Sequence, residues 1–160
     1  MRVQRVYLDT SVLGGCFDAE FAPWSNQLLN DFRQQRLYPV LSTLVAAELQ
    51  DAPPAVQAVY QELMTLGAEL LTVTEPAIEL ASAYQRHGIL TAKFYTDGLH
   101  IGVATVADVD VVVSWNFKHI VHFEKIRLFN AVNLEYGYKP LYIHSPREVT
   151  YYGTTDNQGR

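Results

Sequence analysis

The stretch that most restricts the possible folds of this chain is residues 109–115, VDVVVSW. Valine dominates it, and apolar and polar side chains do not alternate in its middle. A strand of this composition is typical of the centre of a parallel sheet, where helices cover both faces. Because parallel neighbours need crossover connections, usually helices, the rest of the chain should alternate between strands and helices.

The other predicted elements do alternate along the chain. Further strands are predicted at residues 3–8, 37–41, 68–74 and 141–144. Helices are predicted at residues 24–35, 42–50, 53–67, 75–87, 97–107 and 117–136, with a short one from Ser145. This order predicts an α/β fold, a three-layer α/β/α sandwich around a central, mainly parallel sheet of about five strands.

Length and composition predict one globular domain over residues 1–150, followed by a polar C-terminal tail at 151–160. No apolar run approaches the ~18 residues of a membrane span, and the first residues lack the hydrophobic region of a signal peptide. Cys16 has no second cysteine to pair with. Together these features predict a cytoplasmic protein without membrane contact.

The net charge is −5 at pH 7, from 12 Lys and Arg against 17 Asp and Glu. A chain this acidic is not a general binder of phosphates. If it handles nucleic acid, a local basic strip or a bound cation has to overcome the repulsion. Some of the carboxylates are therefore candidate metal ligands.

Four polar residues fall at comparable places on this layout. Asp9 ends the first strand, Glu48 lies on the helix after the second, Asp97 begins the helix before the fourth, and Asn116 follows the fourth. Ligands of open α/β sheets bind beyond the carboxyl ends of the strands, so these side chains should converge there. Two carboxylates ~4 Å apart repel by about 4 kcal/mol at an effective dielectric near 20. Such a cluster takes up protons or binds a hard cation, Mg²⁺ or Mn²⁺, which is suited to phosphodiester hydrolysis.

Each candidate also has a structural explanation. Helix capping is the alternative for Asp9, Asp97 and Asn116. Glu48 could be a solvated carboxylate on its helix. Two nearby residues, His100 and His119, would more often be structural polar residues than ligands. A basic strip of Lys118, His119, Lys125 and Arg127, interleaved with Trp115, Phe117 and Phe123, could contact RNA, or could be a solvated helix face over core aromatics.

Four motifs, in order, carry a family resemblance. They are YLDTSVL with Asp9, the Ser42 to Glu48 segment, DGLHIGVAT with Asp97, and VVVSWNFKHI with Asn116; SPREV follows near the end. Over residues 3–150 the chain resembles the PIN domain family of metal-dependent nucleases, which includes the VapC-like toxins of bacterial type II toxin–antitoxin pairs.

The resemblance implies a Mg²⁺ or Mn²⁺ site formed by Asp9, Glu48 and Asp97, with RNA as the substrate. It also implies a homodimer and a cognate antitoxin whose tail occupies the active-site groove. Ser11 corresponds to a hydroxyl that hydrogen-bonds the first carboxylate or a metal-bound water. Many members carry an acid where this chain has Asn116, which would position water or phosphate instead.

Two other functions remain open from the sequence. The first is a catalytically weak or inactive PIN-like module that binds RNA or a protein. The second is a phosphatase with Asp9 as its nucleophile, although such enzymes usually need a second acid two residues later, where Ser11 stands. The expected function is Mg²⁺- or Mn²⁺-dependent endoribonuclease activity, with Lys118 and His119 contacting the substrate.

Overall fold

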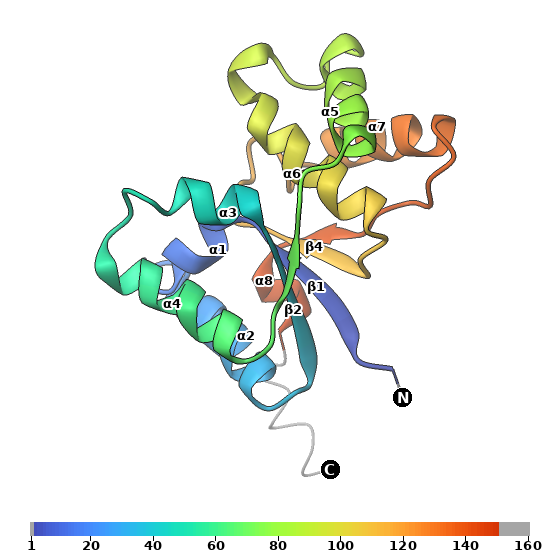
Figure 1. Ribbon diagram of the computed structural model, residues 1–160. Coiled ribbons are helices and arrows are strands. Elements are labelled where there is room, and N and C mark those ends of the chain that lie inside the picture. Colours follow the sequence, from blue (N-terminus) through green and yellow to red (C-terminus); the bar gives the residue numbers. More distant parts are fainter. Residues whose placement is uncertain (1, 151–160) are drawn as a thin grey trace.

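A computed structural model describes residues 2–150 of the chain (Figure 1). Its centre is a five-stranded sheet in which every neighbouring pair is parallel, in the order β3-β2-β1-β4-β5. The strands are β1 (Gln4–Leu8), β2 (Leu37–Ser42), β3 (Glu69–Leu71), β4 (Val111–Val113) and β5 (Ile143–His144). The tail expected at residues 151–160 lies outside the described residues.

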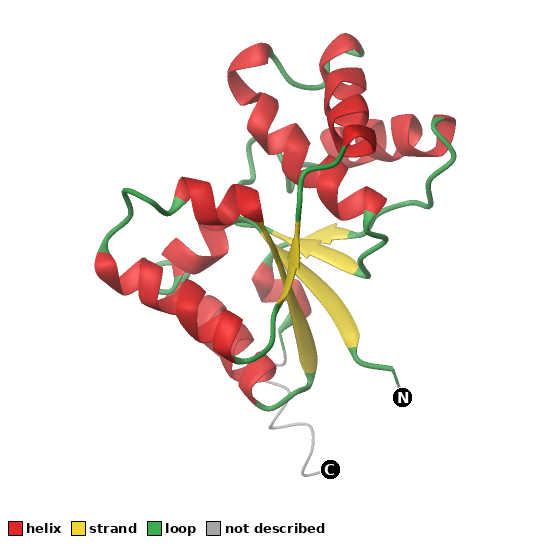
Figure 2. Ribbon diagram, in the orientation of Figure 1, coloured by secondary structure: helices red, strands yellow, loops and turns green. Residues whose placement is uncertain are grey.

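Helices cover both faces of the sheet (Figure 2), so the expected α/β/α sandwich is confirmed. One face carries α1 (Thr10–Gly15), α2 (Ala22–Arg33), α4 (Pro54–Thr65) and α8 (Pro146–Val149). The other carries α5 (Glu75–Arg86), α6 (Tyr95–Val106) and α7 (Phe123–Glu135). Between them, α3 (Thr43–Glu48) follows β2 directly, and the 3₁₀ helix η1 (Ala92–Phe94) precedes α6. None of the helices in the described part is long and apolar enough to cross a membrane.

The two cores follow from side-chain alternation along the central strands. In β1, Val6 and Leu8 pack into the core on one face, and Tyr7 packs into the core on the other. In β4, Val113 packs into the same core as Val6 and Leu8, and Val112 packs into the same core as Tyr7. Where both faces are buried, in the last three residues of β1 and in β4, the side chains are valine, leucine and tyrosine, which is the pattern that predicted a central parallel strand.

Two segments differ from the sequence-based expectation. Helix α1 was not predicted, because Gly14 and Gly15 are poor helix formers, but Val12 and Leu13 bury its inner face. The helix expected at 117–136 begins only at residue 123. The residues before it form a turn in which the Asn116 side-chain oxygen accepts a hydrogen bond from the backbone of His119 at 2.9 Å.

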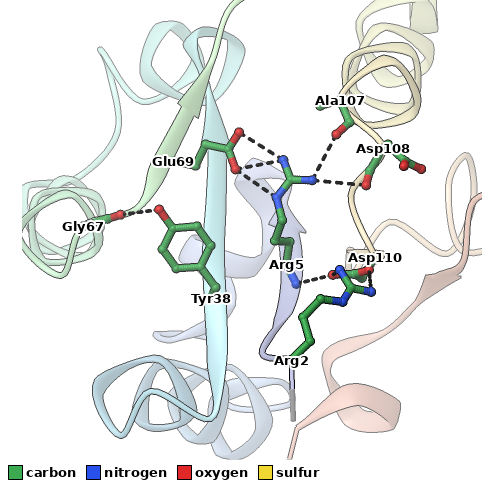
Figure 3. A network of polar contacts seen from close by, with 8 residues as sticks. All are labelled: Arg2, Arg5, Tyr38, Gly67, Glu69, Ala107, Asp108 and Asp110. Carbon is green, nitrogen blue, oxygen red and sulfur yellow. Dashed lines mark hydrogen bonds and ion pairs between the residues drawn. The ribbon is translucent and has the colours of Figure 1, made fainter.

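A polar network joins the strands at their amino ends (Figure 3). The Arg5 guanidinium donates to both carboxylate oxygens of Glu69, at 2.8 and 3.0 Å, and to the carbonyl oxygens of Ala107 and Asp108. The backbone N–H of Arg5 donates to Asp110 at 2.7 Å. This network ties β1 to β3 and to the turn before β4, so the opposite edge of the sheet remains for a functional site.

Candidate functional site

Asp9 is the first residue after β1 and lies at the carboxyl edge of the sheet. Its side chain is buried and accepts hydrogen bonds from two hydroxyls, Ser11 at 2.6 Å and Ser114 at 2.8 Å. Although Asp9 occupies the N-cap position of α1, its side chain makes no capping hydrogen bond. The carboxylate is therefore held against the end of β4 and does not serve as a helix cap.

Burial raises the pKa of the Asp9 carboxyl, and the negative charge of Glu48 raises it further. The hydrogen bonds from Ser11 and Ser114 act in the opposite direction but do not outweigh burial. A carboxyl in this position is stabilised by a proton or by a cation.

Glu48, the last residue of α3, is held by two side chains. Its Oε1 accepts a hydrogen bond from the Thr10 hydroxyl at 3.0 Å and lies 2.6 Å from Nε2 of His100. Burial alone would raise the pKa of Glu48, but the hydrogen bonds from His100 and Thr10 lower it overall. Glu48 is thus an ionised carboxylate of fixed orientation, and not a freely solvated one.

His100 belongs to a buried chain of hydrogen bonds that begins at a helix cap. Its Nδ1 lies 2.7 Å from the Tyr7 hydroxyl, which lies 2.7 Å from the Ser42 hydroxyl. Ser42 accepts from the backbone N–H of Leu44, as the N-cap of α3. One arrangement satisfies every hydrogen: Ser42 donates to Tyr7, Tyr7 donates to Nδ1, and Nε2–H donates to Glu48. In this arrangement His100 positions the Glu48 carboxylate.

Tyr7→Phe should break this chain. The variant leaves His100 Nδ1 and the Ser42 hydroxyl without their partner, so it should lower the free energy of unfolding by about 1–3 kcal/mol. It should also remove the preference of His100 for the Nε2–H tautomer, which ¹⁵N NMR of the ring measures. Tyr84→Phe, a change at an equally buried tyrosine bonded to Asn133, should lose stability without altering His100. An unchanged His100 tautomer in Tyr7→Phe would refute the chain.

Asp97 lies in the first turn of α6 and is half-buried. Burial raises the pKa of its carboxyl, Glu48 raises it as well, and a hydrogen bond from the Asn116 side chain and the nearby His119 oppose the rise. Asn116 therefore does two things, because its oxygen accepts from the His119 backbone while its amide N–H₂ is left to donate to Asp97. The negative charge of Glu48 raises the pKa of both Asp9 and Asp97, so the three carboxylates lie along the same rim, at the carboxyl edge of the sheet.

Within residues 2–150, no group of three or more His, Cys, Asp or Glu side chains is arranged as a ready set of metal ligands. Each carboxylate is held by protein donors instead: Asp9 by two serines, Glu48 by Thr10 and His100. The chemistry of the donors still fits a hard cation, since they are carboxylate oxygens, two of them with raised pKa values. The predicted three-carboxylate metal site therefore stays a prediction.

Sequence analysis missed three residues that shape this rim, namely Thr10, Ser114 and Tyr7. Ser114 follows a predicted central strand as Asp9 does, and the observed pairing of Leu8 with Val113 brings Asp9 and Ser114 side by side. Thr10 and Tyr7 flank the predicted Asp9, but their partners Glu48 and His100 are distant in sequence. For His100 the sequence favours a structural role over a ligand role.

The predicted basic strip divides into two parts. His119 stacks on Phe94 with ring centroids 3.8 Å apart, close enough to Asp97 for the two to interact, and the exposed Lys118 precedes it. Burial lowers the pKa of His119. On α7, Lys125 donates to the carbonyl oxygen of Ile89, and Arg127 pairs with Glu124.

Comparison with solved structures gives the class of fold. The crystal structure of VapBC2 from Rickettsia felis, bound to a DNA fragment from the VapBC2 promoter, contains a chain that is similar in fold. The TM-score is 0.56 at 14% sequence identity, and the match covers 89% of this chain and 98% of that chain. A chain of FitAcB from Neisseria gonorrhoeae matches with a TM-score of 0.56 at 17% sequence identity, and the match covers 90% of this chain and 99% of that chain. The protein thus has a PIN-like, VapC-like fold. No protein-family model matches the chain, and no curated protein matches it by sequence.

Proposed function

We propose that this protein is a Mg²⁺- or Mn²⁺-dependent endoribonuclease and the toxin of a type II toxin–antitoxin pair. The observation that carries the proposal is the buried Asp9 carboxyl with its raised pKa at the end of β1, on the same rim as Glu48 and Asp97. The VapC-like fold and the four ordered motifs support it. RNA, a cognate antitoxin and a second copy of the chain are its proposed partners, in the cytoplasm.

The residues of the rim have distinct proposed roles. Asp9, Asp97 and Glu48 would hold the cation, which would activate a water and stabilise the leaving oxygen. Ser11 and Ser114 orient Asp9, while Thr10 and His100 orient Glu48. Asn116 orients Asp97 and is the group available to position water or phosphate.

Purified protein should cleave single-stranded or structured RNA in the presence of Mn²⁺ and stop when a chelator is added. Because a cation has to displace protons from carboxyls with raised pKa values, Mn²⁺ should bind more weakly as the pH falls through the raised values. Calorimetry at several pH values measures this dependence. Absence of Mn²⁺ binding at millimolar concentration would refute the proposal.

The second candidate is a PIN-like module that binds RNA or a protein without cutting. It is favoured by Asn116 in place of an acid and by the lack, among the described residues, of a ready group of three ligands. This alternative predicts that binding survives Asp97→Asn and that no metal supports cleavage. A cleavage assay with Mg²⁺ and Mn²⁺, run beside a binding assay, separates the two.

A further inference from the structure

Two exposed lysines, Lys93 and Lys118, lie near Asp97 and contact no carboxylate in the described part of the chain. Within residues 2–150, Lys93 and Lys118 form no ion pair. In the same part of the chain, each arginine contacts a carboxylate, a tyrosine hydroxyl or a tryptophan ring. The chain has four lysines, and three of them, Lys93, Lys118 and Lys125, lie around the Phe94–His119 stack. Within residues 2–150, three lysines that contact no carboxylate thus lie beside the acidic rim.

The stack itself is an aromatic surface next to these cations. The Phe94 and His119 rings lie with centroids 3.8 Å apart and planes 29° apart, and Lys93 Nζ lies 5.5 Å from the Phe94 centroid. His119 Nδ1 is buried and has no hydrogen-bond partner among the described residues, while the ring stacks on Phe94. Phe94 is half-buried and Lys93 is exposed, so the ammonium can leave the ring for a ligand.

We propose that Lys93, Phe94, Lys118 and His119 form a nucleotide subsite for single-stranded RNA, beside the position of cleavage. Aromatic side chains flanked by cations are the usual means of binding single strands without reading their sequence. The subsite adjoins Asp97 through His119 and Asn116. It rests on the proposed function for its biological substrate, but it predicts RNA binding even if the protein does not cut. An acidic peptide could pair with the lysines, but it would leave the aromatic surface unused.

Fluorescence anisotropy of a labelled single-stranded oligoribonucleotide tests the subsite. The background is full-length Asp9→Asn with chelator present, so that neither cleavage nor a bridging metal contributes. Combining Lys93→Ala with Lys118→Ala should weaken binding and lower the slope of log affinity against log salt by about 0.7 for each lysine removed. Phe94→Leu should weaken binding about tenfold without changing that slope. Lys139→Ala is the matched control, because Lys139 pairs with Asp108 near the amino ends of the strands.

The outcomes separate this subsite from the nuclease proposal. If the double lysine variant keeps the affinity and salt slope of its parent, the subsite is refuted, whether or not the wild type cleaves RNA. Stronger binding of poly-glutamate than of RNA would also overturn it, in favour of an acidic protein partner. If no metal supports cleavage but the lysine and Phe94 variants still lose RNA binding, the subsite stands and the nuclease proposal fails.

Discussion

Asp9→Asn should reduce metal-dependent RNA cleavage on the order of a thousandfold or more. Asparagine preserves the size of the side chain and can still accept a hydrogen bond from Ser11 or Ser114, so the rim should keep its shape. It removes the negative charge that would hold the cation. Cleavage rates at saturating Mn²⁺ measure the effect, and Asp51→Asn is the matched control, since Asp51 is exposed.

The same variant should be more stable than the wild type in chelator at neutral pH. A folded-state pKa that burial has raised means that the ionised Asp9 opposes folding above that pKa. Asparagine removes this penalty, so the gain in the free energy of unfolding should grow as the pH rises above the ordinary Asp pKa towards the raised one. It should disappear as the pH falls below the ordinary Asp pKa, where the wild-type carboxyl is protonated in both states. A variant that loses activity and also stability at neutral pH would contradict this account of Asp9.

Sequence reasoning predicted that Asp9, Glu48, Asp97 and Asn116 lie together at one edge of a parallel sheet. That expectation depended on apolar runs such as residues 109–115 and on the rule that ligands bind at strand carboxyl ends. The five parallel strands and their covering helices confirm the fold that carried it. The ligand roles of the three carboxylates are proposals that the fold supports.

The contacts that orient those residues could not be predicted in the same way. Glu48 and His100 are 52 positions apart, and no local pattern shows that they meet. Residues 89–95 lie between two predicted helices and show no helical pattern, yet they contain η1 with Lys93 and Phe94. The stacking of Phe94 on His119 depends on the turn at Asn116, which stands where helix was expected. Local pattern thus predicts elements, while long-range packing decides side-chain roles.

Gly102 in α6 should be the least replaceable glycine for stability. A Cβ atom at this position would lie 2.7 Å from the carbonyl oxygen of Ala77 in α5, and backbone cannot yield as a flexible side chain can. Because α6 also carries Asp97 and His100, forcing α5 and α6 apart would displace part of the rim. The close approach of these helices therefore links the packing of one core to the geometry of the site.

Gly102→Ala should lower the free energy of unfolding by about 2–3 kcal/mol, although alanine is the better helix former. Urea denaturation measures the change. Gly14→Ala is the matched control, because no atom lies within 4 Å of a Cβ built there, so this helical glycine should be neutral or gain up to about 1 kcal/mol. In Gly102→Ala the His100 ring signals should also shift, as the rim moves with α6. Equal stability of the two variants would show that α5 and α6 can separate at no cost, and that Gly102 does not fix the position of Asp97.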